Sequence, residues 1–327
     1  MSRSSTSRRS GPPLVIGHRG ACGYLPEHTF PAKAYAHALG ADCLEQDVIL
    51  TRDDVPIVFH DLTLEAMTDV ARLFPARRRS DGHWYAIDFS YAELGQLSLH
   101  ERSDPAGGQP AWPRRFGELL PLRIHSLAEE LALVRGLNRS TGRHTGVFTE
   151  VKSPAWHREA GKDLMPIVLG VLADFGYRAE GDAATLLCFD EAELRRTRLQ
   201  LGSRLPLVQL IGENAWAEAA TDYDRLRTVA GLADVASYAQ GIGPWLPQVV
   251  TWPAPGAAPV VTPLVRDAHA AGLAVYPFTF RIDQLPDNAP DADAAHQALF
   301  ELADIDGLLS DFPDVTLAYL RRRSLRP

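Results

Sequence analysis

The chain has 327 residues, 46 % of them hydrophobic, which suits one large α/β domain or two small domains. Its 33 basic and 41 acidic residues give a net charge of -8, whereas nucleic-acid-binding proteins usually carry a basic excess. The three cysteines, Cys22, Cys43 and Cys188, are too few to indicate a disulfide framework. No apolar run approaches the roughly 20 residues of a membrane span, so we expect no stable membrane insertion and no nucleic-acid partner.

The first twelve residues are rich in Ser and Arg and predict a disordered basic leader. Arg8 and Arg9 form a twin-arginine pair, but no apolar segment with a small-residue cleavage site follows them. The chain as written therefore favours a cytoplasmic location. A missing or unconventional signal would make the protein periplasmic or secreted.

Short apolar runs, many of them β-branched, alternate with helical patterns along residues 13–320. This alternation predicts a single α/β domain with a TIM (β/α)₈ barrel. Nine runs resemble strands, and the link between Asp47 and Ile57 is too short for a helical crossover, so we expect one extra strand. The strand candidates are residues 14–16, 43–49, 57–59, 147–148, 186–189, 207–208, 235–236, 273–278 and 307–309, and the helix candidates are residues 29–39, 127–137, 163–175, 191–201 and 261–271.

Residues 62–125 interrupt the alternation after the third strand segment. They predict an insertion on the functional rim of the barrel, with weak structure of its own. Loops on that rim commonly shape the substrate pocket.

Ionisable residues gather where apolar runs stop. Catalytic groups of a barrel lie at the carboxyl ends of several strands, so these residues should converge in space. They are His18-Arg19-Gly20, Glu45-Gln46-Asp47, His60-Asp61 and Glu150-Val151-Lys152.

Glu45 and Asp47 are two positions apart on a predicted strand and therefore share a face. Two buried carboxylates repel each other unless a cation lies between them. With Glu150 they would form a hard oxygen site suited to one divalent cation, Ca²⁺ or Mg²⁺. Glu-x-Asp alone also fits an exposed acidic strand end. The added Glu150 and two histidines favour the metal site.

Arg19 and Lys152 predict a site for a phosphate anion beside the metal. The alternative is that each cation simply pairs with a neighbouring carboxylate. Three carboxylates, one divalent metal, two cations and a phosphodiester sum to nearly zero charge, as a partly buried site requires. His18 and His60 titrate near neutrality and can serve as general base and general acid.

Four ordered blocks resemble the glycerophosphodiester phosphodiesterase family, from about His18 to Asp314. The blocks are Val15-Ile16-Gly17-His18-Arg19-Gly20-Ala21 with Pro26-Glu27-His28-Thr29; Leu44-Glu45-Gln46-Asp47 with Thr51-Arg52-Asp53-Asp54 and Phe59-His60-Asp61; Glu150-Val151-Lys152; and Asp306-Gly307-Leu308-Leu309-Ser310-Asp311-Phe312-Pro313.

The resemblance implies a TIM barrel with a substrate-covering insertion. It also implies a site in which each group has a role: Glu45, Asp47 and Glu150 bind the divalent metal, His18 and His60 are the acid–base pair, and Arg19 and Lys152 hold the phosphate. The Pro-Glu-His-Thr form and the run 241–244 are similar to a bacterial periplasmic branch, which favours Ca²⁺ over Mg²⁺. Glu27 is expected to orient Arg19 or its loop.

The expected substrates are glycerophosphocholine, glycerophosphoethanolamine and similar diesters, cut to glycerol 3-phosphate and an alcohol. The nucleophile is either the glycerol 2-hydroxyl, giving a cyclic phosphate, or a water activated by the metal. By analogy His18 is the base and His60 the acid. Tyr238, Trp245 and Phe280 are candidates for the leaving-group pocket, with ordinary rim packing as their alternative role.

Two other functions compete with this one. A phospholipase-type phosphodiesterase acting on lipids should carry apolar rim loops or an amphipathic surface helix, and none is clear. A non-catalytic phosphate-binding barrel should have lost a histidine or a carboxylate, and none is missing. The sequence indicates no particular oligomeric state.

Overall fold

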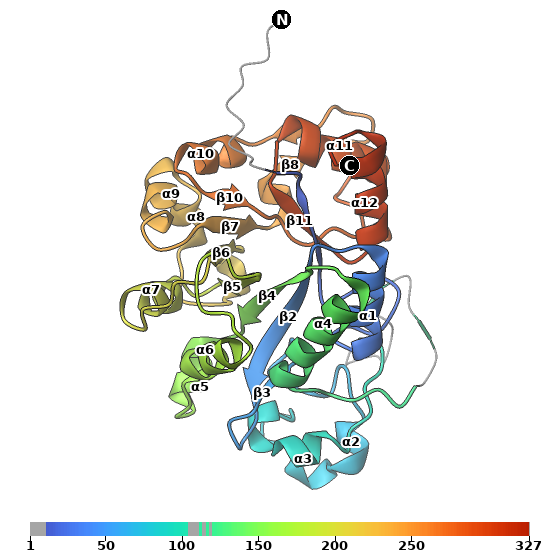
Figure 1. Cartoon of the computed structure of the whole chain (residues 1–327), viewed down its shortest axis with the longest axis vertical. Coiled ribbons are helices and arrows are strands. Elements are labelled where there is room, and N and C mark those ends of the chain that lie inside the picture. The colour runs from blue at the N-terminus through green and yellow to red at the C-terminus, as the bar shows by residue number, and fades with distance from the viewer. Residues whose placement is uncertain (1–10, 104–110, 113–115, 118–119, 327) are drawn as a thin grey trace, which may run out of the picture.

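The computed structural model describes residues 11–103, 111–112, 116–117 and 120–326, so most of the predicted leader lies outside it. Its main sheet contains eight parallel strands in the order β10-β7-β6-β5-β4-β2-β1-β11 (Figure 1). These are β1 (Leu14–Gly17), β2 (Cys43–Leu50), β4 (Gly146–Val151), β5 (Ala184–Cys188), β6 (Leu207–Ile211), β7 (Gly241–Pro244), β10 (Ala274–Val275) and β11 (Gly307–Ser310).

The two outer strands of this order approach each other and close the sheet. The backbone N of Asp306 donates to Val275 O at 3.0 Å, Leu309 N donates to Pro277 O at 3.0 Å, and Phe280 N donates to Leu309 O at 2.9 Å. Helices surround the strands (Figure 1), which confirms the predicted TIM barrel. The helices are α1 (Phe30–Leu39), α2 (Val70–Leu73), α3 (Tyr91–Leu94), α4 (Leu127–Thr141), α5 (Pro154–Glu159), α6 (Leu164–Asp174), α7 (Glu191–Leu199), α8 (Tyr223–Leu226), α9 (Val229–Val235), α10 (Leu264–Ala270), α11 (Ala292–Gln297) and α12 (Pro313–Arg322).

The expected extra strand is β3 (Pro56–Val58). It turns back along β2 as an antiparallel partner, with Val48 opposite Val58 and Ile49 opposite Ile57. An antiparallel return needs no helical crossover, which explains the short link before it. A small hairpin, β8 (Val250–Thr251) with β9 (Val260–Val261), lies apart from the barrel sheet.

Two of the expected strands differ from the structure. Residues 235–236 are not a strand, because Val235 ends helix α9. The strand at that place in the barrel is β7, whose sequence Gly-Ile-Gly-Pro carries no strand-like pattern. Of the predicted run 273–278, only Ala274–Val275 pairs regularly, as β10.

Helix ends follow the local signals in the sequence. The Thr29 side chain accepts a hydrogen bond from Ala32 N at the start of α1, and Gly40 ends that helix with φ 109°. Ser126 and Glu129 form a capping box that starts α4. Helix α10 begins at Leu264, later than predicted, because Val261 belongs to strand β9.

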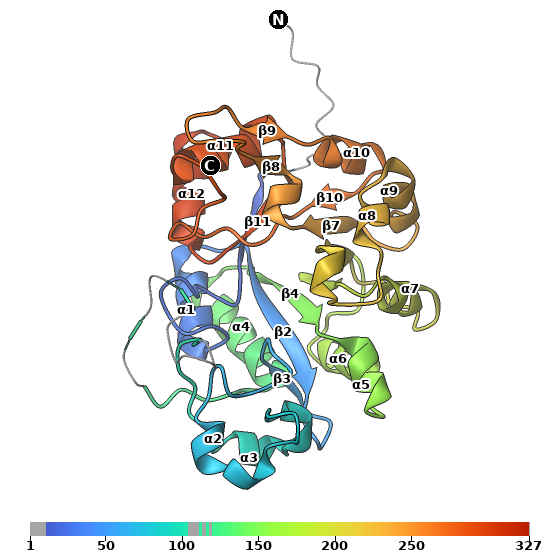
Figure 2. The same cartoon turned by 180° about the vertical axis from the view of Figure 1, so that it is seen from behind.

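The barrel interior and the insertion have separate apolar clusters. The interior is filled by six buried side chains, Ile16, Phe148, Leu187, Val208, Leu210 and Leu309. The described part of the segment after β3 contains short helices, and Trp84 and Phe89 are buried in a second cluster that includes Ile49 of β2 and Ile57 of β3. Figures 1 and 2 show α2 and α3 beyond the end of β2, beside β3. The boundaries 62 and 125 stay a prediction.

Candidate functional site

The carboxyl ends of β1, β2 and β4 bring the predicted site residues together. Asp47 of β2 lies directly opposite Glu150 of β4 in the parallel register. His18 and Arg19 follow β1, which pairs with β2 on its other side. Because neighbouring parallel strands end at the same edge, three strands supply one site.

Glu45, Asp47 and Glu150 form a buried acidic cluster, with one carboxylate oxygen from each lying within 4.8 Å of the others. Burial and the charge of Asp47 raise the pKa of Glu45 to about 8. Burial, with Asp47 nearby, also raises the pKa of Glu150 well above its usual range. Among the described residues, Oδ1 of Asp47 is buried without a hydrogen-bond donor. An oxygen-only donor set with an unsatisfied buried atom fits a divalent cation such as Ca²⁺ or Mg²⁺.

Lys152 lies at the open side of this cluster. Its Nζ is 2.7 Å from Glu150 Oε1, 3.9 Å from Asp47 Oδ1 and 3.3 Å from His60 Nε2. Burial alone would lower the pKa of Lys152, but the surrounding carboxylates raise it above the usual value. The ammonium therefore stays charged and faces the cavity with one histidine beside it.

Arg19 is fixed by an unusual backbone conformation and by acidic neighbours. Its φ of 52° is in the left-handed region, and its backbone N donates to Glu45 Oε2 at 2.6 Å. Its Nη1 donates to Glu27 Oε1 at 2.8 Å, the position from which Glu27 was expected to orient it. The next residue, Gly20, has φ 95°, and a Cβ there would lie 2.7 Å from the backbone of Ala32.

His18 and His60 both line the cavity, and each contacts an aspartate through Nδ1. His18 Nδ1 is 2.6 Å from Asp311 Oδ1, and the other oxygen of Asp311 accepts from Arg281. His60 Nδ1 contacts Asp61 Oδ1. In both rings the contact leaves Nε2 for other partners, which fixes the orientation of each imidazole.

The pKa of His60 is lowered to about 3 by burial and by the charges of Arg19 and Lys152. His60 is therefore neutral near pH 7 in the free protein. With Nδ1–H donated to Asp61, its Nε2 is a proton acceptor.

Arg102, which lies in no recognisable motif of the sequence, connects the insertion to the site. Its Nη2 donates to Glu27 Oε1 at 2.7 Å, its Nε to Glu27 Oε2 at 3.0 Å, and its Nη1 to Asp61 Oδ2 at 2.6 Å. One guanidinium thus holds the partner of Arg19 and the partner of His60.

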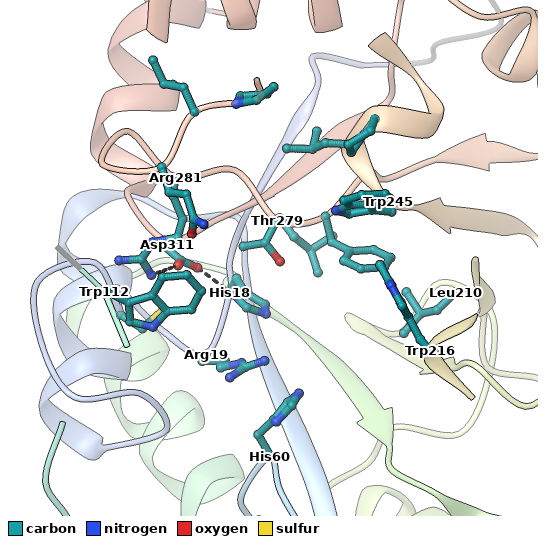
Figure 3. Close-up of a pocket in the computed structure, with 18 of the residues that line it drawn as sticks. His18, Arg19, His60, Trp112, Leu210, Trp216, Trp245, Thr279, Arg281 and Asp311 are labelled. Atoms are coloured by element: carbon teal, nitrogen blue, oxygen red, sulfur yellow. Dashed lines mark hydrogen bonds and ion pairs between the residues drawn. The ribbon is translucent and has the colours of Figure 1, made fainter. Parts of the chain in front are cut away.

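A cavity of about 660 Å³ opens at this end of the barrel. His18, Arg19, His60, Glu150 and Lys152 line it. Figure 3 shows His18, Arg19 and His60 in its middle. Glu27 and Trp245, two of the expected pocket residues, also line it.

Tyr238 and Phe280, the other two expected pocket residues, do not line this cavity. Tyr238 is buried, and its hydroxyl donates to Gln209 Oε1 at 2.9 Å. Phe280 is fully buried with its ring 4.2 Å from that of His296. Both aromatics face the layer between strands and helices, where they are packed as core.

His28 is buried, with Nε2 2.7 Å from Asp47 Oδ2. His37, on α1, and His125 are buried as well. The sequence analysis assigns no role to Asp61 or Asp311, the partners of the two histidines. Asp61 directly follows His60, and Asp311 lies in the terminal block of the family resemblance. Trp112, Trp216 and Glu218, which line the cavity, carried no such signal.

Within the described residues, no helix combines the length and apolar character that a membrane span requires.

Known proteins resemble this chain over most of its length. Residues 18–315 match the Glycerophosphoryl diester phosphodiesterase family. The chain is 37 % identical to a glycerophosphodiester phosphodiesterase of Haemophilus influenzae, covering 94 % of this chain and 90 % of that protein. It is 34 % identical to one of Treponema pallidum, covering 94 % and 91 %.

Solved structures show the same fold. A glycerophosphoryl diester phosphodiesterase structure from Silicibacter pomeroyi superposes with TM-score 0.72 and 27 % identity, covering 97 % of each chain. A phosphodiesterase from Oleispira antarctica, solved with its product sn-glycerol-3-phosphate, has TM-score 0.63 and 19 % identity, covering 95 % of this chain and 97 % of that chain.

Proposed function

This chain belongs to the glycerophosphoryl diester phosphodiesterase family, and on that premise we propose that it hydrolyses glycerophosphocholine, glycerophosphoethanolamine and similar diesters to glycerol 3-phosphate and the free alcohol. One observation carries the proposal. Two histidines and two cations line a single cavity next to three buried carboxylates. Hydrolysis of a phosphodiester needs cations that offset the phosphate charge, a proton acceptor and a proton donor. The two cations and the two histidines can supply these groups.

Arg19 and Lys152 bind the phosphate in this proposal. Both are charged, both line the cavity, and each is held by a carboxylate at hydrogen-bond distance. Groups that are already oriented before the substrate arrives stabilise developing negative charge at low reorganisation cost.

Glu45, Asp47 and Glu150 would hold one divalent cation. Ca²⁺ is favoured over Mg²⁺, since Mg²⁺ usually binds through one or two carboxylates and keeps several waters. When bound, the cation supplies further positive charge against the phosphate oxygens.

His18 and His60 move the protons. One accepts the proton of the nucleophile, and the other gives a proton to the leaving alcohol as the bond between phosphorus and that oxygen breaks. A bound diester places negative charge beside Arg19 and Lys152, which offsets the charges that lower the pKa of His60 and favours its acid form. If the glycerol 2-hydroxyl attacks, water then opens the cyclic phosphate and one glycerol 3-phosphate results on either route.

The test is release of glycerol 3-phosphate by the purified full chain from glycerophosphocholine, glycerophosphoethanolamine and glycerophosphoglycerol. Each reaction is run after chelation and after Ca²⁺ or Mg²⁺ is restored. We expect release only with metal, and more with Ca²⁺. Phosphorus NMR during turnover detects a cyclic phosphate if the 2-hydroxyl is the nucleophile.

Asp47→Asn is the matched variant, because it removes one charge from the cluster. It should abolish metal-dependent release, whereas Asp293→Asn, at an exposed ion pair with Arg322, should not. No release from any diester with either metal would overturn the proposal. Hydrolysis restricted to lysophospholipid vesicles would instead support a lipid phosphodiesterase.

A further inference from the structure

The side of the cavity away from Trp112 has aromatic walls that the reaction chemistry does not use. The rings of Trp216 and Trp245 meet at 69° with centroids 5.2 Å apart. Phe189 and Phe278, which also line the cavity, meet at 89° with centroids 5.6 Å apart. Figure 3 shows Trp216 and Trp245 together on one side of the cavity and Trp112 on the other. Rings inclined to each other in this way form a corner that can face a ligand from two directions.

The two sides of the cavity differ in whether a cationic side chain lies over their tryptophan rings. The guanidinium of Arg281 lies 4.1 Å from the ring centre of Trp112, so that ring already faces a cation. Among the described residues, no Lys or Arg side chain lies over the ring of Trp216 or Trp245. Trp216 is also 40 % exposed, a large apolar surface left at the mouth of a cavity. In the described part of the chain, neither of these two rings already holds a cation.

A carboxylate accompanies the two indoles. Glu218 lines the cavity and is exposed, and within the described part of the chain it makes no hydrogen bond or ion pair. Burial lowers the pKa of Lys152, whereas the charges of Glu150, Asp47 and Glu218 raise it. The charge of Glu218 therefore acts on Lys152, the cation proposed to bind phosphate. Glu218 therefore adds a negative charge to the lining of the cavity that contains both tryptophans and Lys152.

We propose that Trp216, Trp245 and Glu218 form a subsite for the cationic headgroup of an ammonium alcohol, with choline the best fit. Aromatic faces attract quaternary ammonium ions, and an unpaired carboxylate adds long-range attraction without requiring a hydrogen bond. A neutral polyol headgroup needs hydrogen-bond partners that indole faces do not offer. The subsite rests on the proposed function, since the headgroup reaches this corner when the phosphate lies between Arg19 and Lys152.

A binding measurement tests the subsite independently of catalysis. Choline is titrated into the full chain and tryptophan fluorescence is followed, with 3,3-dimethylbutanol as the uncharged analogue of the same shape. We expect saturable quenching by choline alone, and its loss in Trp216→Leu. Trp156→Leu is the control, because Trp156 stacks on Tyr85 outside the cavity. Equal responses to choline and to 3,3-dimethylbutanol would overturn the proposal.

Kinetics test the consequence for specificity. Trp216→Leu and Glu218→Gln should each lower kcat/KM for glycerophosphocholine about tenfold, mainly through KM, and change kcat/KM for glycerophosphoglycerol less than about twofold. Trp216 and Glu218 are exposed, so both variants should fold. Equal losses for both diesters would overturn the subsite while the proposed hydrolysis stands. Failure to cut any diester would overturn the hydrolysis, and choline binding would still decide the subsite.

Discussion

His18 and His60 are held by two similar chains of contacts that come from different regions of the molecule. His18 contacts Asp311, which accepts from Arg281; we call these three residues the barrel arm. His60 contacts Asp61, which accepts from Arg102; these three form the insertion arm. The barrel arm joins the ends of β1 and β11. The insertion arm joins the loop after β3 to the insertion.

The two arms differ in burial. Asp311 and Arg281 are 2 % and 4 % exposed, whereas Asp61 and Arg102 are 22 % and 17 % exposed. Breaking a buried charge pair leaves a charge without compensation, while a pair reached by water loses much less. The barrel arm is therefore tied to the stability of the fold. The insertion arm can change while the barrel stays intact.

The largest expected effect comes from the histidines themselves. His18→Ala and His60→Ala should each lower kcat by about 10²- to 10⁴-fold, because each removes one of the two groups proposed to transfer protons. Circular dichroism should show an unchanged fold. His83→Ala, at a 49 % exposed position, is the control. Near-normal turnover in either variant would remove that histidine from the mechanism.

Replacing Asp311 and replacing Asp61 should have similar effects on activity but different effects on stability. Asp311→Asn should lower the free energy of unfolding by about 3 kcal/mol, because Arg281 stays buried with less compensation. Asp61→Asn should lower it by less than about 1 kcal/mol. Both should reduce kcat, since both orient a histidine. Urea denaturation at pH 7 measures the difference, and equal losses of stability would contradict the comparison.

Acid should weaken the barrel region through His296, which packs beneath Phe280, the neighbour of Arg281. Burial lowers the pKa of His296 to about 4, against about 6.5 in an unfolded chain. As the pH falls from about 6.5 to 4, the unfolded chain therefore binds a proton that the folded chain excludes, and stability falls by on the order of 2–3 kcal/mol. His296→Gln should flatten this part of a pH series of urea midpoints. If the urea midpoint of the variant depends on pH as steeply as that of the parent chain, groups other than His296 cause the acid sensitivity.

The smallest expected effect is at the insertion arm. Arg102→Gln should lower kcat by about tenfold, since the contacts with Glu27 and Asp61 orient Arg19 and His60, and should cost less than about 1 kcal/mol of stability. Arg72→Gln, at a 70 % exposed arginine of the same insertion, should change neither quantity. A large drop in melting temperature for Arg102→Gln would show that the two arms are equally structural.

The barrel could be predicted because its strands are apolar runs of the expected length. Strand β7 could not be predicted, because its glycines are explained by the space that neighbouring strands leave and not by a local sequence pattern. A Cβ at Gly243 would lie 2.6 Å from Leu210 Cδ2, and one at Gly241 would lie 3.0 Å from Ala274 O, so neighbouring strands leave little room for a side chain at either position. The side-chain alternation that marks a strand is absent for that reason, and residues 235–236 are the nearest strand-like run in the sequence.

In the site, sequence reasoning selected the residues with reactive groups at strand ends, but it missed most of the residues that hold them. Arg102 contacts Asp61 across 41 residues of an insertion without periodic pattern. Tyr238 and Phe280 were selected for their nearness to strand ends, which does not say toward which layer a side chain points. Those choices depend on tertiary packing, which a single sequence does not reveal.

The contact between His18 and Asp311 joins positions 293 residues apart in a chain of 327. Strand β1 likewise obtains one of its two neighbours from β11. During synthesis the amino-terminal half leaves the ribosome long before its final partners exist. His18 therefore gains its aspartate only when translation is nearly complete, and a chain that stops before Asp311 would carry most of the cavity residues but leave the His18 ring without this partner.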